Sequence, residues 1–267
     1  MTDSCLIHSS FSKTFGSIHA ITHSPDGQLM ATGDSNGNIQ LWRTDNHQYL
    51  TTLLGHTSGI WSIAFSPNGQ LLVSGSDDST ARLWDLQELR CLHVFEGHIK
   101  RIYSVAISPN GKILASGSSD STIRLWDLQT CQSLCTLEGH TERIWSLAFS
   151  PDGKILASGS GDSTIRLWNA QEHQLISIFK GHTASVSSIA FSPNGQALAS
   201  GSMDFTVRLW NLNEHECIHV FNGHTDWVWS IAFSTDGQIL ASGDDAAVIR
   251  LWDIPNLQCI HFMKGQT

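Results

Sequence analysis

"GHTERIWSLAFSPDGKILASGSGDSTIRLWNAQEHQLISIFK" spans residues 139–180 and contains, in 42 residues, the pattern that predicts the fold. Four short runs in it are rich in β-branched, aromatic or leucine residues: 144–149, 155–160, 164–168 and 175–179. Each run is bounded by Gly, Pro, Asp or Asn, which is typical of β-strands. The links are short enough for antiparallel hairpins, and "SPDG" and "SGDS" between the runs suit tight turns.

The same pattern recurs every 42 residues. A Gly-His pair begins at Gly55, Gly97, Gly139, Gly181 and Gly223, and a tryptophan followed by a polar residue stands at Trp42, Trp84, Trp126, Trp168, Trp210 and Trp252. The repeats therefore run over 13–54, 55–96, 97–138, 139–180, 181–222 and 223–264. A four-stranded unit of this kind cannot bury both of its apolar faces alone, so the units must stack, and radial stacking makes a β-propeller. We predict one all-β domain over 1–267: a propeller of six blades, each with four antiparallel strands.

On its Gly-His and Trp-Asp signature the chain resembles the WD40 repeat family. The resemblance implies a ring of four-stranded blades around a central channel. Repeats as regular as these are similar to bacterial, especially cyanobacterial, WD40 arrays, which are often appended to signalling NTPases as sensor domains. No P-loop "GxxxxGK" occurs in the sequence, so an NTPase of that kind would lie outside this chain.

The two ends of the sequence raise the question of how the ring closes. Residues 5–11 have the pattern of an outer strand, which makes seven such strands for six blades. We predict a closed six-bladed ring in which one terminal strand pairs beside 248–252. The other would lie at the edge or on a neighbouring molecule, because an unpaired strand edge invites self-association. An open or assembled ring is the alternative.

Composition excludes several partners. The formal net charge of -9 opposes the attraction to phosphate backbones that nucleic-acid binding requires. The sequence has neither an apolar run of 18 residues for a membrane span nor the basic and apolar regions of a signal peptide. Cysteines at equivalent positions of different blades are too far apart to form disulfides, so we expect free thiols in a reducing, cytoplasmic compartment, with no metal and no cofactor.

One set of polar residues could be mistaken for a hydrolase triad. It recurs in four repeats: His56, Ser74, Asp78, Trp84; His98, Ser116, Asp120, Trp126; His140, Ser158, Asp162, Trp168; and His182, Ser200, Asp204, Trp210. Catalysis needs one activated group in one singular environment, so four copies favour a structural role and predict no catalytic residue. The family resemblance implies a hydrogen-bonded network that rigidifies each blade.

Two repeats depart from this set. The first has Thr14, Thr32 and Asn36 in place of His, Ser and Asp, and the last has Ala246 in place of Asp. We expect lower stability in these two blades. A regular series of arginines, two residues before five of the tryptophans, is expected to pack along the blades and pair with nearby carboxylates, with an anion-binding ring as the alternative.

Positions that vary among the repeats are the candidates for function. They are the second, third and fifth after the Gly-His pair and the residue before the turn aspartate, and the resemblance implies that they lie at the channel entrance. The partner-binding residues predicted from them are Trp61, Tyr103, Trp145, Trp227, Trp229, Lys100, Arg101, Glu142, Arg143, Asp77, Met203 and Asp226. Trp, Tyr and Arg dominate binding hot spots, and the mixture of charges suits a protein or peptide. The alternative for the aromatic residues is simple packing between neighbouring blades.

The sequence thus predicts a non-enzymatic scaffold that binds a protein or peptide through the channel-entrance face, as the sensor part of a signalling NTPase system. The alternative is a propeller that binds a small ligand, or hydrolyses one, in the central channel. That alternative would need a unique polar cluster in the channel, and the sequence indicates none.

Overall fold

The structure, a computed structural model, describes residues 16–265, so the predicted outer strand 5–11 and Thr14 lie outside the described residues. Within 16–265 the chain forms 24 strands and no helix. The strands make six separate sheets of four, and in each sheet consecutive strands pair antiparallel. The prediction of an all-β propeller with six blades of four antiparallel strands is confirmed.

The blades follow the repeats in order. Blades 1 to 3 are β1 (Ile18–His23), β2 (Leu29–Asp34), β3 (Ile39–Arg43), β4 (Tyr49–Leu53); β5 (Ile60–Phe65), β6 (Leu71–Ser76), β7 (Ala81–Asp85), β8 (Arg90–Phe95); and β9 (Ile102–Ile107), β10 (Ile113–Ser118), β11 (Ile123–Asp127), β12 (Ser133–Leu137). Blades 4 to 6 are β13 (Ile144–Phe149), β14 (Ile155–Ser160), β15 (Ile165–Asn169), β16 (Leu175–Phe179); β17 (Val186–Phe191), β18 (Ala197–Ser202), β19 (Val207–Asn211), β20 (Glu216–Phe221); and β21 (Val228–Phe233), β22 (Ile239–Asp244), β23 (Val248–Asp253), β24 (Gln258–Lys264).

Local chemistry accounts for the turns. In blade 4 the Gly153 amide donates to the Ser150 carbonyl at 2.8 Å, and Gly153 has a φ of +71°, a conformation that glycine adopts without steric cost. The Ser150 hydroxyl donates to Asp152 at 2.7 Å and accepts the Ile155 amide at 2.9 Å. The stretch "SPDG" therefore closes the hairpin between β13 and β14 with its own side chains.

The hydrophobic core lies between blades rather than inside them. Five buried clusters join blades 1 and 2, 2 and 3, 3 and 4, 4 and 5, and 5 and 6. Between blades 4 and 5, for example, Ile165, Leu167 and Phe179 pack against Val186 and Ile189. Each blade therefore supplies one apolar face to the blade before it and another to the blade after it.

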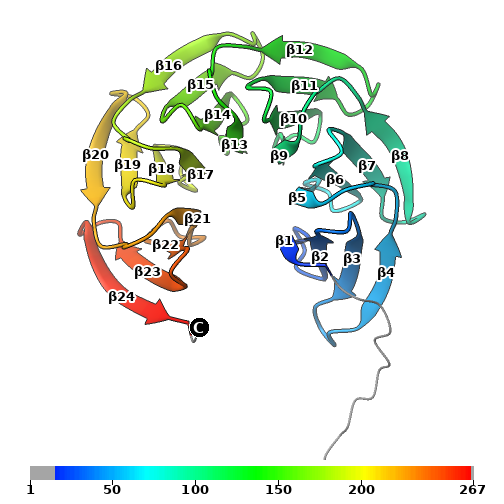
Figure 1. Ribbon diagram of the computed structural model, residues 1–267, viewed down its shortest axis with the longest axis horizontal. Coiled ribbons are helices and arrows are strands. Elements are labelled where there is room, and N and C mark those ends of the chain that lie inside the picture. The colour runs from blue at the N-terminus through cyan, green and yellow to red at the C-terminus, as the bar shows by residue number, and fades with distance from the viewer. Residues whose placement is uncertain (1–15, 266–267) are drawn as a thin grey trace, which may run out of the picture.

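The ring does not close. Figure 1 shows the blades around a central space, with an opening between β1–β4 and β21–β24. Each innermost strand packs against the next, from β1 and β5 through to β17 and β21, but within residues 16–265 no comparable packing joins β21 to β1. The prediction of a closed ring is wrong, and the open ring named as its alternative is the one observed. The sequence period counts blades but does not specify the angle between them, which depends on how their faces pack.

The terminal strand is where the sequence predicted one. β24 pairs antiparallel with β23, from Gln258 opposite Asp253 to Lys264 opposite Val248. The sixth blade is therefore completed by its own outer strand, and a strand at 5–11 is not needed for that purpose.

Candidate functional site

The variable loops and turns meet on one rim at the channel entrance. One backbone hydrogen bond joins the two sets in every blade. The residue just before the turn-aspartate position donates its amide to the carbonyl of the third residue after the Gly-His position, at 2.8–3.0 Å. The pairs are Ser35 with Ser17, Asp77 with Gly59, Ser119 with Arg101, Gly161 with Arg143, Met203 with Ser185, and Asp245 with Trp227. The structure thus brings the two predicted sets of variable positions together in all six blades.

The fifth loop position coincides with a bulge in the first strand of each blade. In blade 4 the pairing register between β13 and β14 shifts between Ile144 and Ser146, which leaves Trp145 as the extra residue. The same shift skips the equivalent residue in the other blades. Because a bulge re-aims one side chain out of the regular alternation, the backbone explains how this side chain can reach the equivalent residues of other blades.

Four aromatic side chains at this position form a continuous chain of contacts, here called the aromatic arc: Trp61, Tyr103, Trp145 and Trp229. Ring centroids are 5.3 Å apart for Trp61 and Tyr103, 4.6 Å for Tyr103 and Trp145, and 5.8 Å for Trp145 and Trp229. Trp227 touches Trp229 at 6.0 Å. Trp229 and the neighbouring Trp227 are exposed, at 37% and 44%, whereas the other three rings of the arc are half-buried. The arc is therefore partly packing and, at its blade 6 end, open surface.

Acceptors for the indole N–H groups differ along the arc. Trp61 Nε1 donates to Asp77 Oδ1 at 2.7 Å, and Trp229 Nε1 donates to Asp245 Oδ1 at 2.9 Å. Trp145 faces a turn with Gly161 at the corresponding position, and its buried Nε1 has no partner within residues 16–265. Two of the three tryptophans are thus held in place by a carboxylate of their own blade.

Charged side chains surround the arc. Arg101 Nε lies 3.4 Å from Asp77 Oδ1, across the joint between blades 3 and 2, and the Arg143 guanidinium lies 5.3 Å from the Trp145 ring centroid. Lys100 and Glu142 are exposed, as are both arginines. This rim offers both signs of charge next to apolar rings.

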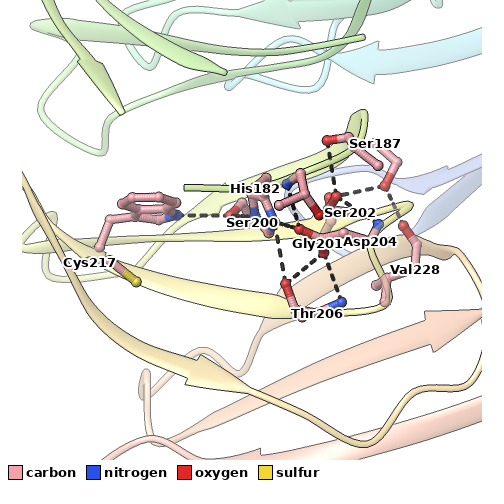
Figure 2. Close-up of polar contacts among 12 residues, drawn as sticks. His182, Ser187, Ser200, Gly201, Ser202, Asp204, Thr206, Cys217 and Val228 are labelled. Carbon is pink, nitrogen blue, oxygen red and sulfur yellow. Dashed lines mark hydrogen bonds and ion pairs between the residues drawn. The ribbon is translucent and has the colours of Figure 1, made fainter. Parts of the chain in front are cut away.

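Two further predicted residues, Asp226 and Met203, lie on the rim without joining the arc. Asp226 Oδ1 accepts the Trp227 amide at 2.8 Å, so it helps to order that loop. Met203 is half-buried on the turn of blade 5. In that blade the fifth position is Ser187, whose buried hydroxyl contacts the carbonyls of Gly201 and Val228 (Figure 2), so blade 5 contributes no ring.

The His, Ser, Asp and Trp residues of blade 5 form one bonded chain (Figure 2). Because an ionised carboxylate can only accept, His182 Nδ1 donates to Asp204 Oδ2 at 2.8 Å, and Nε2 accepts from Ser200 Oγ at 2.7 Å. Trp210 Nε1 donates to the same hydroxyl at 2.8 Å. Equivalent bonds of 2.7–2.9 Å join the members in blades 2, 3 and 4: His56, Ser74, Asp78, Trp84; His98, Ser116, Asp120, Trp126; and His140, Ser158, Asp162, Trp168.

The electrostatics of this network favour an ionised Asp and a neutral His. Burial of the Asp204 carboxyl favours its protonated form, but hydrogen bonds from His182, Thr206 and the Thr183 amide outweigh it and hold the pKa of Asp204 well below its ordinary value. Burial lowers the pKa of His182, an effect that Asp204 offsets only in part. The imidazole is enclosed and has no free acceptor, so the arrangement holds a blade together and offers no general base.

The sixth blade has a carboxylate that the sequence reasoning missed. Ala246 occupies the usual Asp position, but Asp244, two residues earlier, accepts from His224 Nδ1 at 2.7 Å. Ser242 and Trp252 complete the chain as in other blades. A signal was present, because four repeats have Ser at the position of Asp244. The expectation of an incomplete network in the last blade is wrong.

Blade 1 also has an aspartate at the position of Asp244, but this residue, Asp34, has different partners. Asp34 accepts the amides of Asn36 and Asn38, both at 2.9 Å, and so orders the turn without a histidine. Its tryptophan, Trp42, has a buried Nε1 with no partner within residues 16–265. In this blade the sequence and the structure agree that the network is incomplete.

The five arginines that stand two residues before a tryptophan pack along the blades but form no ion pairs with carboxylates among the described residues. They are Arg82, Arg124, Arg166, Arg208 and Arg250. Guanidinium groups lie against the loop glycines, as at Gly139 beside Arg166, and three lie about 6 Å from the tryptophan of their own blade, as Arg208 does from Trp210. Their Nε atoms are buried without a partner, and among residues 16–265 none forms an ion pair with a carboxylate. The expected packing is present, whereas the expected carboxylate pairing is wrong.

Two hollows lie away from the arc. One of about 430 Å³ is on the opposite end of blades 5 and 6, lined by turn residues such as Asn194, Asn211 and Pro255. Another of about 460 Å³ is on blade 1. In the described part of the chain no three His, Cys, Asp or Glu side chains gather into a metal site, and no helix has the length and apolar character needed to cross a bilayer.

Comparison with known proteins gives two family matches. The profile described as "Echinoderm microtubule-associated protein second beta-propeller" matches residues 102–265, more than half of the chain. The profile "WD domain, G-beta repeat" matches residues 6–43 and 47–85.

Similar curated proteins match over about one repeat. An uncharacterized WD repeat-containing protein of Nostoc sp. is 47% identical over 55 residues, which is 21% of this chain and 4% of that protein. The human serine-threonine kinase receptor-associated protein is 38% identical over 52 residues, 20% of this chain and 13% of that protein. The matched stretches thus span a small part of these relatives.

Proposed function

Because the chain belongs to the WD40 repeat family, whose propellers are typically protein-interaction scaffolds, we propose that it binds a protein or peptide at its channel-entrance face without catalysing a reaction. The observation that carries this proposal is the blade 6 end of the aromatic arc, where Trp227 and Trp229 are exposed beside charged loops. Large aromatic surfaces next to mixed charge are typical of binding hot spots.

One matched family profile and one similar protein bear names that denote association with other proteins: the profile is of a microtubule-associated protein, and the similar protein is kinase receptor-associated. This supports a protein partner. The bonds that hold Trp61 and Trp229 to Asp77 and Asp245 support it too, because anchors that are already ordered lose less entropy on binding.

The setting we propose is a bacterial cytoplasm, with the propeller as the sensor part of a signalling NTPase system. The 47% identity to a Nostoc WD repeat protein supports the bacterial setting. Free thiols at five described cysteines, Cys91, Cys131, Cys135, Cys217 and Cys259, fit a reducing compartment.

The test is a peptide selection followed by alanine variants. Peptides selected from a displayed library on the folded protein would be titrated against Trp61→Ala, Tyr103→Ala, Trp145→Ala and Trp229→Ala. Each true anchor should weaken binding by about 2 kcal/mol or more, roughly 30-fold in Kd, with Trp229 the strongest candidate. Leu89→Ala is the control, because Leu89 is similarly exposed, at 46%, but lies on the opposite end of blade 2.

The contrary result is specific. The four alanine variants could instead melt several degrees below the unmodified protein while the affinity per folded molecule stays the same. In that case these rings serve only to pack the blades together, and the proposed binding face is wrong. For the small-ligand alternative, a saturable rise in melting temperature with one metabolite or metal, lost in Trp61→Ala or Trp229→Ala, would favour that reading instead.

A further inference from the structure

The two ends of the open ring expose the two halves of an interface that the molecule forms five times internally. At each internal joint the face of one blade packs on the opposite face of the next. Within residues 16–265, blade 6 has no blade after it and blade 1 has none before it, so neither blade is covered on that face by another described blade (Figure 1). This surface is distinct from the channel-entrance face.

The free face of blade 6 carries the side chains of an internal joint, but uncovered. Ile249 and Met263 are both 45% exposed. The counterparts of Ile249, each exposed by 1% or less, are Ile39, Ala81, Ile123, Ile165 and Val207. The counterparts of Met263, each exposed by 4% or less, are Leu53, Phe95, Leu137, Phe179 and Phe221. The free face of blade 6 therefore carries apolar side chains at the same positions as an internal joint, but among residues 16–265 no blade packs on it.

Gly243 and Ser230 show where that neighbour would sit. At the positions equivalent to Gly243, an added Cβ would lie 2.6–2.9 Å from an Ile or Val of the next blade: Gly33, Gly75, Gly117, Gly159 and Gly201. At Gly243 nothing lies within 4 Å. Four serines equivalent to Ser230 accept a backbone amide of the next blade at 2.9–3.2 Å: Ser62, Ser104, Ser146 and Ser188. Ser230 is exposed, and within residues 16–265 its hydroxyl has no partner.

The free face of blade 1 is the matching half. Ile18 is 57% exposed and Ile21 is 62% exposed. The residues equivalent to Ile18, each exposed by 1% or less, are Ile60, Ile102, Ile144, Val186 and Val228. The hollow of about 460 Å³ on blade 1 is lined by Ile18, Ile21, Met30 and Trp42, side chains of the kinds that an adjoining blade covers elsewhere.

We propose that the opening between blades 6 and 1 is a docking site for a single four-stranded β-sheet, one blade, supplied from outside residues 1–267. The internal joints define its chemistry. Toward blade 6 it would present a Val or Ile over Gly243 and a backbone N–H to Ser230. Toward blade 1 it would present a Gly in its second strand beneath Ile18 and Ile21, flanked by large apolar side chains.

A second copy of this chain does not meet these requirements. In the described part of a copy, only blades 1 and 6 have a free face, and the other face of each is already covered by its own neighbour. No blade of a copy can therefore cover both faces of the opening. The 15 residues before the described part are too few for four strands of five or six residues each.

Direct packing of blade 6 on blade 1 is disfavoured by the repeated geometry. The close approach of Ile or Val to glycine is the same within 0.3 Å at all five joints, so the angle at each joint is set by tight contact. Closing the ring would change all five at once, and close-packed interfaces resist such deformation. A blade in the opening buries both faces without altering any joint.

The test uses one repeat of the chain as the probe. A fluorescent fusion of residues 139–180 to a soluble carrier would be titrated with the protein of residues 1–267. We expect saturable one-to-one binding that is weakened at least tenfold by Gly243→Val and, separately, by Ile21→Asp. Gly243→Val should leave the melting temperature unchanged because the space is empty. The matched change Gly201→Val should lower it, because Val228 occupies that space.

The control is Ile99→Asp, which alters an 81% exposed apolar side chain on an entrance loop and should change the probe Kd by less than twofold. Absence of probe binding to the folded protein would overturn the proposal. So would binding that survives either Gly243→Val or Ile21→Asp, because the blade must contact both faces.

Two other results would also overturn it. Association of the chain with itself, concentration-dependent in sedimentation and abolished by Gly243→Val, would place a second copy on these faces. Rapid short-range cross-linking in a monomer between Ile21→Cys and Met263→Cys would show that the ring closes by itself. A failure of the channel-entrance variants in peptide binding would leave these outcomes unaffected, so the two proposals fail separately.

Discussion

Replacing Asp162 by Ala tests the hydrogen-bonded network in a blade where it is complete. Asp162 accepts from His140 Nδ1 at 2.7 Å, from the Thr164 hydroxyl at 2.6 Å, and from the amides of Thr164 and Thr141 at 2.9 and 3.2 Å. The His140 side chain is 1% exposed, so water cannot replace its lost acceptor. Thr141 is exposed and Thr164 is partly exposed, so their donors regain water.

The cost follows from that difference. One stranded buried donor costs about 1–3 kcal/mol, and the two bonds to Thr164 add about 1 kcal/mol. We expect Asp162→Ala to destabilise the protein by about 2–4 kcal/mol. At about 2–4 °C per kcal/mol for chains of this size, the melting temperature should fall by roughly 5–15 °C in a thermal melt followed by circular dichroism.

Two matched variants in blade 6 sharpen the test. Asp244→Ala should cost about as much as Asp162→Ala, because Asp244 accepts from His224 at 2.7 Å and from the Val248 amide at 2.9 Å. Ala246→Ser, at the position where blades 2 to 5 have Asp, should cost less than about 0.5 kcal/mol. A melting temperature for Asp162→Ala within 1 °C of the unmodified protein would refute the reasoning. If Asp162→Ala destabilises the protein as expected but Asp244→Ala leaves its stability unchanged, Asp244 does not replace the carboxylate missing at position 246.

Two further predictions concern pH and the ends of the chain. Burial lowers the pKa of His182 and His224 below the ordinary 6.5, so the unfolded state takes up protons first and stability should fall as pH drops below about 6.5. A second loss of stability should begin below about pH 4. The pKa values of the network aspartates are depressed in the folded state, so these groups protonate more readily in the unfolded state. A melting temperature that stays constant from pH 7.5 to pH 3 would contradict both expectations. Deleting 258–267 removes β24 and should lower the melting temperature far more than deleting 1–11, which removes none of the described strands. Equal falls in melting temperature by calorimetry would show that residues 1–11 are as necessary as residues 258–267.

The candidate site was only partly readable from the sequence. Variation among the repeats pointed to the rim, and the structure places Trp61, Tyr103, Trp145 and Trp229 in contact there. Which rings are open to a partner could not be read, because exposure depends on neighbouring blades that are remote in sequence. Trp229 is more exposed than the other three, and in the part of the chain that the structure describes no blade follows blade 6.

By itself, the sequence determined the number of blades, their strands and their turns, since these depend on interactions within 42 residues. The Ile, Trp, Leu and Phe residues of β13 and the Gly153 turn would form the same β13–β14 hairpin in any copy of the repeat. Only the tertiary structure decided that Asp244 replaces the carboxylate missing at position 246, because that depends on the reach of a side chain across a folded turn. It also decided that the ring stays open, because tight packing at five joints sets the angle between blades and so leaves Ile249 and Ile21 uncovered at its ends.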